Sequence, residues 1–229
     1  MTMPADIHLV RLGLCNCYLV RDEGIILVDT GMPNLQSKFV QRLEALAIDP
    51  QDISLIFLTH GHWDHIGGLV EIKALTGCKA AINQHEKMIV EQGLKPFPPS
   101  VNLWGSILHA LIKIRYRSSL NFPGAPVDLA LEDREYPLEP YGIQGKILYT
   151  PGHSSGSMSL LLDSGEAFAG DLAVNGPPMR IGPNMSVFAE DPATVKRSWR
   201  LLLDNGAKWV YPAHGKPFEA DALKKLMTR

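Results

Sequence analysis

The sequence predicts an α/β fold in a single domain. Short apolar runs of strand length alternate along the chain with stretches in which apolar residues recur at helical spacing. The 229 residues are 45% hydrophobic and 20% charged, which is enough apolar material for one sizeable core. No change of composition divides the chain into two parts. We therefore expect one domain that spans residues 1–229.

The first part of the chain is predicted to begin with a hairpin, because two apolar runs flank a polar turn at 21–23. A helix follows where Leu35, Phe39 and Leu43 fall on one face. The next strand, SLIFL, is entirely apolar, which is typical of a buried strand. In chain order, the expected elements are the strands 15–20 and 24–28, the helix 34–47, the strand 54–58, the helix 69–75 and the strand 78–82.

Residues 92–126 interrupt this alternation and are predicted to form a helical insertion. Prolines mark its two ends, at 96–99 and at 123–126. Between them a wide apolar stripe predicts one amphipathic helix over about 102–115. After the insertion we expect the strands 143–149, 157–162 and 166–169, a helix at 192–204, a last strand that ends in KWVYPAHG, and a closing helix at 218–227.

The helix predicted over 102–115 has two interpretations. Its apolar stripe either caps the domain core or a dimer interface, or it forms a lid over an apolar substrate pocket. In the second case Arg115 and Arg117 would meet an anionic substrate, although a solvated helix end explains both equally well. Loosening a lid should change KM far more than metal content, and an unchanged KM would count against it.

The segment His60-Gly61-His62-Trp63-Asp64-His65 is the strongest chemical signal in the sequence. Four of its six side chains bind transition metals, and the segment directly follows the apolar strand at 54–58. In a loop at a sheet edge, residues two apart can turn toward one ion, while Asp64 and His65 face a second ion. Imidazole nitrogen and carboxylate oxygen suit zinc, iron or manganese.

Three later segments each place one more metal-binding side chain just beyond a predicted strand. These side chains are His153 in PGH, Asp171 in GD and His214 in PAHG. Each signal is weak alone, because a single histidine in a turn is more often a local hydrogen-bonding group. Together with the first segment they make a set of five histidines and two aspartates at strand ends.

With these segments in place, the chain resembles the metallo-β-lactamase fold superfamily. The resemblance is carried by LVDTG at 27–31, THGHWDH at 59–65, TPGHSSGS at 150–157, AGD at 169–171 and PAHG at 212–215, in the family's order. It implies a four-layer αββα sandwich of two mixed sheets, with the site at one edge between them. It also implies roles: His60, His62 and His153 bind one metal, Asp64, His65 and His214 bind a second, Asp171 bridges both, and Asp29 is a buried carboxylate that holds the ligand loop in place.

The implied reaction is hydrolysis by a hydroxide that bridges two divalent ions, most simply zinc. Asp64 would orient this hydroxide and carry its proton to the leaving group. The chain departs from true zinc β-lactamases, which lack the bridging aspartate that Asp171 supplies. Few residues follow His214, and neither a flavodoxin domain nor a basic arm is present. We therefore expect a small ester, thioester or lactone as the substrate.

Two other functions remain open from the sequence. The same ligand set occurs in family members that bind a single iron and act as sulfur dioxygenases. A non-catalytic binding module is a further alternative, although it has little reason to keep seven converging polar groups. About two equivalents of zinc or manganese would favour the hydrolase, and one iron with oxygen uptake on a persulfide would favour the dioxygenase.

Charge and composition exclude several partners. The net charge is −2 and no basic stripe is visible, which argues against nucleic acid. No apolar run is long enough to span a membrane, and no export signal precedes the first strand, so we expect a cytoplasmic protein. A homodimer is left open. Cys15 and Cys17 share one face of a strand, which favours packing over a metal or redox site.

Overall fold

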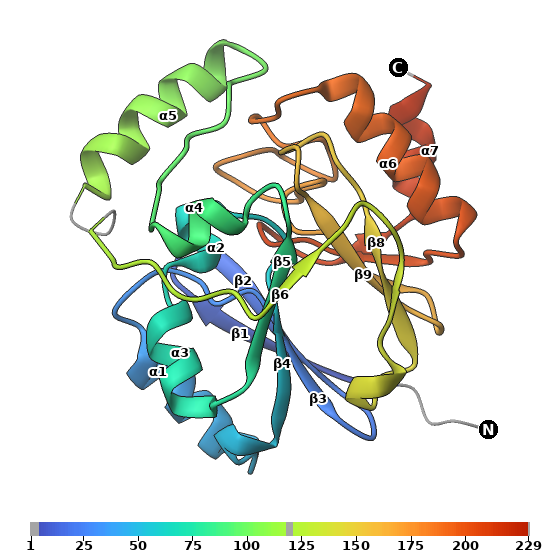
Figure 1. Cartoon of the computed structure of the whole chain (residues 1–229). Coiled ribbons are helices and arrows are strands. Elements are labelled where there is room, and N and C mark those ends of the chain that lie inside the picture. Colours follow the sequence, from blue (N-terminus) through green and yellow to red (C-terminus); the bar gives the residue numbers. More distant parts are fainter. Residues whose placement is uncertain (1–4, 118–120, 229) are drawn as a thin grey trace.

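Two six-stranded sheets form the centre of the molecule in a computed structural model that describes residues 5–117 and 121–228 (Figure 1). In the first sheet the strands lie in sequence order; β1 to β3 are antiparallel and β3 to β6 are parallel. Its strands are β1 (Asp6–Leu12), β2 (Cys15–Arg21), β3 (Ile25–Val28), β4 (Ile53–Phe57), β5 (Lys79–Asn83) and β6 (Leu129–Leu131).

The second sheet is mixed and runs in the order β12-β11-β10-β9-β8-β7. Its one parallel pair is β10 with β11, and the other neighbours are antiparallel. Its strands are β7 (Tyr136–Pro137), β8 (Gly145–Tyr149), β9 (Met158–Leu162), β10 (Glu166–Phe168), β11 (Trp209–Tyr211) and β12 (Phe218–Glu219).

Helices cover the outer face of each sheet, which completes the four layers. On the first sheet lie α1 (Gln36–Ala45) and α3 (Leu69–Thr76), and on the second lie α6 (Pro192–Asp204) and α7 (Asp221–Met227) (Figure 1). A separate apolar core joins the inner faces of the two sheets. The alternation along β2 explains why nearly all of it is buried, because Cys17 and Leu19 face the helices while Tyr18 and Val20 face the other sheet. The predicted αββα sandwich is confirmed.

The insertion holds the helix that the sequence predicts. Helix α5 (Leu103–Arg115) begins after Asn102, whose side chain accepts a hydrogen bond from the Gly105 N–H at 2.8 Å. It stands at the edge of the molecule, away from both sheets (Figure 1). Its inner face packs through Gly105 and Leu108, whereas Leu103 and Ile114 on the outer face are each 78% exposed.

Some predicted boundaries were wrong. The closing helix begins at Asp221 and not at 218, because residues 218–219 pair with β11 as the short strand β12. The segment 60–65, named here the metal-binding segment after its predicted role, is not all loop, since Trp63–Ile66 forms one helical turn, α2. The sequence analysis also missed β1, β6, β7 and the short helix α4 (Lys87–Glu91). In the described part of the chain, no helix is both long and apolar enough to cross a bilayer.

Candidate metal centre

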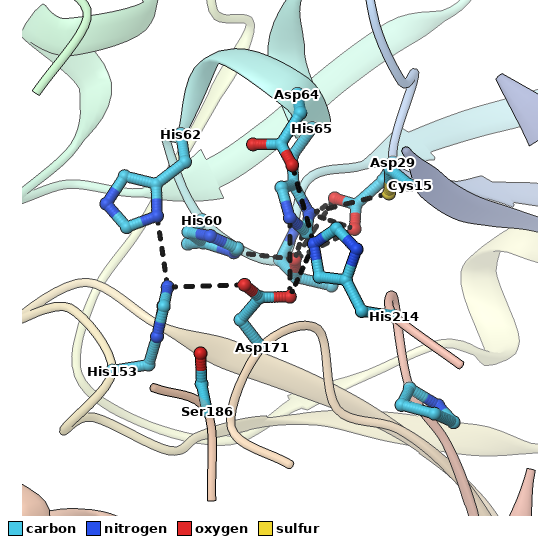
Figure 2. A network of polar contacts seen from close by, with 12 residues as sticks. Cys15, Asp29, His60, His62, Asp64, His65, His153, Asp171, Ser186 and His214 are labelled. Carbon is cyan, nitrogen blue, oxygen red and sulfur yellow. Dashed lines mark hydrogen bonds and ion pairs between the residues drawn. The ribbon is translucent and has the colours of Figure 1, made fainter. Parts of the chain in front are cut away.

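The seven side chains predicted to bind metal converge at one edge of the two sheets (Figure 2). Four come from the segment after β4, and the other three follow β8, β10 and β11. Every one of them is at most 8% exposed, so their polar atoms are largely shielded from bulk solvent. Their positions are set by strand ends from both sheets, which meet at this edge. The seven residues are His60, His62, Asp64, His65, His153, Asp171 and His214.

The first of two groups consists of His60, His62 and His153, whose ligand atoms lie within 4.8 Å of one another. His62 Nδ1 and His153 Nε2 are 3.0 Å apart although 91 residues separate them in sequence. Burial, followed by the nearby His153, lowers the pKa of His62 to about 3. Burial also lowers the pKa of His60 and of His153. These imidazoles are therefore neutral and present lone pairs to the same small space, as a transition metal requires.

The second group consists of Asp64, His65 and His214, again with ligand atoms within 4.8 Å. His214 Nε2 lies 3.4 Å from Asp64 Oδ2. Burial favours the neutral imidazole of His214, but Asp171 and Asp64 outweigh it and raise its pKa. The two carboxylates thus supply the negative charge that a second cation would neutralise.

Asp171 lies between the two groups. Its Oδ1 is 3.2 Å from His214 Nε2 and 3.5 Å from His65 Nε2, while its Oδ2 is 3.8 Å from His153 Nε2. Figure 2 shows the carboxylate spanning the gap between His153 and His214. One oxygen therefore faces each group, which is the arrangement that a bridging ligand needs.

The other nitrogen of three imidazoles is held by the protein. His153 Nδ1 donates to the Phe188 carbonyl at 2.8 Å, and His214 Nδ1 donates to the Leu14 carbonyl at 3.1 Å. His65 Nδ1 is 2.8 Å from Asp29 Oδ2. Each contact orients its imidazole ring so that Nε2 is the nitrogen that faces the candidate metal site.

Asp29 occupies the position that the sequence analysis assigned to it. It is 1% exposed, and besides His65 it accepts hydrogen bonds from the backbone N–H and the hydroxyl of Thr59. Its backbone has φ 60°, a left-handed conformation that aspartate tolerates better than most residues. Asp29 thereby fixes both the start of the metal-binding segment and its last histidine.

Four polar atoms at this site are buried and lack a hydrogen-bond partner in the described structure: His60 Nε2, His65 Nε2, His214 Nε2 and Asp171 Oδ1. Buried polar atoms rarely stay unpaired, so a set of four that point together indicates a bound group. Their chemistry, three imidazole nitrogens and one carboxylate oxygen, fits divalent transition metals. The residues present therefore fit the metals that the resemblance implies.

A family model described as the metallo-beta-lactamase superfamily matches residues 10–214. The chain belongs to the metallo-beta-lactamase superfamily. The probable metallo-hydrolase YflN of Bacillus subtilis (strain 168) is 26% identical over 97% of this chain and 90% of its own length. A beta-lactamase-like protein 2 homolog of Drosophila melanogaster is 25% identical over 85% of this chain. The chain spans only 56% of the length of that relative.

Solved structures of the superfamily share the fold of this chain. A metallo-beta-lactamase family protein from Thermus thermophilus aligns with a TM-score of 0.68 over 96% of this chain and 78% of its own, at 21% identity. The BLEG-1 B3 metallo-beta-lactamase aligns with a TM-score of 0.70 over 94% of this chain and 95% of its own, at 18% identity. At these identities the likeness supports the fold alone.

In this superfamily member a pocket of about 410 Å³ opens directly above the metal centre. Five of the seven candidate ligands line it, and His60 and His65 are not among the lining residues. Helix α5 contributes one wall through Leu108, Leu111, Ile112 and Arg115, as a lid would. The choice between a lid and an interface stays a prediction. Arg117, the other arginine considered in the sequence analysis, does not line the pocket.

Glu86 is a buried residue near the site that the sequence analysis missed. It is 2% exposed, and burial raises its pKa. Its carboxylate accepts hydrogen bonds from the Gly61 N–H and the Ser154 hydroxyl, and from the Gly156 N–H at 3.2 Å. Its only sequence signal is a glutamate just after a strand, which is too common to single out.

Cys15 lies closer to the site than simple packing requires. Its Sγ is 3.7 Å from His65 Nδ1, although that nitrogen already contacts Asp29 at 2.8 Å. Cys15 and Cys17 are both fully buried in the core beneath α1 and α3, and burial raises the pKa of each thiol. Both thiols are therefore neutral, which fits packing. The ligand atoms of Cys15, Asp29 and His65 also lie within 4.8 Å of one another, so the preference for packing over a metal site stays a prediction.

Proposed function

We propose that this chain is a hydrolase that holds two divalent metal ions and cleaves a small ester, thioester or lactone. Membership of the superfamily and the metallo-hydrolases named among its relatives support a metal-dependent hydrolase. The single observation that carries the two-metal scheme is the position of Asp171, which offers one carboxylate oxygen to each of two three-residue ligand groups. Zinc is the simplest choice for these ligands, with iron and manganese as competitors.

When bound, a pair of divalent ions lowers the pKa of water and polarises a carbonyl oxygen. The chain's own residues then have three tasks. His60, His62 and His153 present neutral imidazoles on one side of Asp171, and His65 and His214 offer their Nε2 atoms on the other. Asp64 lines the pocket, where its carboxylate can take a proton from the nucleophile and deliver it to the leaving group.

The pocket supports a carbonyl substrate with an apolar portion. Its walls include Phe97, Leu108, Leu111 and Phe188, which would exclude water around the reacting centre. A volume of about 410 Å³ lies in the range of small-molecule sites, about 300–1,000 Å³. Antibiotic hydrolysis is not proposed, because Asp171 distinguishes this ligand set from that of the zinc β-lactamases.

The deciding experiment measures metal content together with a panel of lactones, thioesters and simple esters. We expect about two metal equivalents per chain and turnover of at least one of these three classes. One equivalent of iron, with oxygen consumption on a persulfide, would instead identify a sulfur dioxygenase. Complete inertness of the fully metallated protein across the panel would overturn the hydrolase proposal.

A further inference from the structure

Acidic residues are missing from two of the chain segments that border the pocket. Residues 92–127, which include α5, contain Lys95, Lys113, Arg115 and Arg117 but no aspartate or glutamate. Residues 172–189 contain Arg180 and again no acidic residue. The whole chain, in contrast, has a net charge of −2. Both segments are therefore net positive, and the only carboxylates among the described residues that line the pocket, those of Asp64 and Asp171, belong to the candidate metal ligands.

Two arginines line the pocket itself. Arg115 is at the end of α5, with its guanidinium carbon 5.3 Å from the centroid of the Tyr116 ring. The Tyr116 ring lies 5.6 Å from that of Trp63, which sits between His62 and Asp64 in the chain. These aromatic contacts link Arg115 to the metal-binding segment, which limits where its charge can lie.

Arg11, near the end of β1, is the second arginine of the pocket. Both side chains are solvent-exposed. Within residues 5–117 and 121–228, the arginines that form ion pairs are Arg134 and Arg197, so neither Arg11 nor Arg115 has an acidic partner there. Two guanidinium groups without a carboxylate partner are available to bind an oxyanion.

We propose that the substrate is an anionic amphiphile. Its carbonyl would lie at the metal centre, its apolar part against α5 and Phe97, and its phosphate, sulfonate or carboxylate group between Arg11 and Arg115. This inference rests on the proposed hydrolase function for the reacting bond, but the binding of an anionic apolar molecule can be measured without turnover. Arg11 and Arg115 are then the specificity-determining residues.

The test compares 1-octanesulfonate with uncharged 1-octanol by calorimetry, in metal-free and metal-loaded protein. A sulfonate is used because a carboxylate would bind the metals themselves. We expect R115Q and R11Q each to weaken octanesulfonate binding by about tenfold, the effect of one charge-assisted hydrogen bond, and to leave octanol binding unchanged. R117Q is the matched control, because it removes the same charge two residues away and outside the pocket.

Two results would overturn the inference: octanol binding as tightly as octanesulfonate to the wild-type protein, or R117Q weakening octanesulfonate as much as R115Q does. The second result would mean that overall charge, and not the pocket, attracts the anion. If the protein hydrolyses nothing in the panel but R11Q and R115Q weaken octanesulfonate binding as expected, the proposed hydrolase function fails and the anion site is supported. Failure of the hydrolase proposal is therefore distinguishable from failure of the anion-site proposal.

A different set of contacts carries a second inference. Glu86 follows β5 and lies between two metal-binding segments that are far apart in sequence. One of its oxygens accepts from Gly61, between His60 and His62, and the other accepts from Ser154 and Gly156, just after His153. A Cβ on Gly156 would lie 2.5 Å from Glu86 Cγ, so the fit leaves no spare space.

We infer that Glu86 is a positioning residue that holds the His60–His62 segment and the His153 segment in register for the first metal. Glutamine has nearly the same shape but only one acceptor oxygen. Whichever way its amide is turned, at least one backbone N–H, of Gly61 or of Gly156, would face an NH₂ group. The Ser154 hydroxyl can rotate to accept, but a backbone N–H cannot.

The test is metal affinity by chelator competition, together with the melting temperature of metal-free protein. We expect E86Q to weaken the affinity for one of the two metal ions by about 10- to 100-fold and to leave the affinity for the other near the wild-type value. S154A removes one contact without disturbing Glu86 itself, and it should weaken the same equivalent by a smaller factor. E91Q, on the exposed side of α4, is the matched control.

A purely structural role for Glu86 would lower the melting temperature of metal-free E86Q without changing either metal affinity. That result would overturn the inference, as would an equal loss of both metal equivalents. If E86Q does not fold, S154A still decides the question through the selective loss of one equivalent.

Discussion

Replacing Asp171 with alanine is expected to remove one metal equivalent and to lower kcat/KM by about a thousandfold. The reason is geometric, since its two oxygens lie 3.2 to 3.8 Å from imidazole nitrogens of both ligand groups. Without it, a pair of cations would face each other with no shared carboxylate between them. Metal analysis of the purified variant and steady-state kinetics with the best substrate of the panel measure the two effects.

D163A is the matched control for this variant. Asp163 is exposed in the turn between β9 and β10, so the substitution removes the same charge from the same region of the second sheet. It should leave metal content and turnover at wild-type levels. Wild-type activity in D171A would remove the two-metal scheme, and loss of activity with both metals retained would assign Asp171 a role other than binding them.

The convergence of the candidate metal ligands was predictable because these residue types are dense and follow strands. Within His60 to His65, four ligands lie in six positions after a fully apolar strand, which is a local pattern that needs no knowledge of the fold. His153, Asp171 and His214 were weaker signals singly and were placed by the resemblance. The structure brings all seven side chains together, although metal binding by them stays a prediction.

Contacts between distant segments could not be read from the sequence. Glu86 bonds to residues 25 and 68 positions away, and no local pattern marks such a partner. Arg115 and Arg117 looked equivalent for a similar reason. Which of them reaches the pocket depends on where α5 ends and on how it packs against Tyr116 and Trp63, which only the tertiary structure determines.

The elements that the sequence analysis missed are edge strands or very short. β1 lies at one edge of its sheet and mixes exposed and buried residues, so its apolar alternation is weak. β7 and β12 have two residues each and exist only through pairing with β8 and β11. The same pairing moves the start of the last helix to Asp221, because the residues of β12 form sheet hydrogen bonds instead of a helical turn.

Two substitutions of Asp29 should separate its contribution to stability from its contribution to metal binding. Alanine removes the hydrogen bonds to the Thr59 N–H, the Thr59 hydroxyl and His65 Nδ1, and it also strains a backbone at φ 60°. We expect D29A to destabilise the metal-free protein by on the order of 3 kcal/mol. D29N keeps the backbone preference but has one acceptor oxygen, so it should chiefly weaken metal binding, by about 10- to 100-fold.

The backbone contribution can be measured independently at Asn34, which has φ 62° and an exposed side chain. N34A introduces the same strain with no loss of a contact to the metal centre. It should therefore lower the free energy of unfolding, measured by chemical denaturation, by only about 1 kcal/mol and leave metal affinity unchanged. Subtracting the loss of unfolding free energy in N34A from the loss in D29A gives the contribution of the carboxylate's hydrogen bonds. If D29N bound metal as tightly as wild type, His65 would not need a carboxylate to orient it, and the role assigned to Asp29 would be wrong.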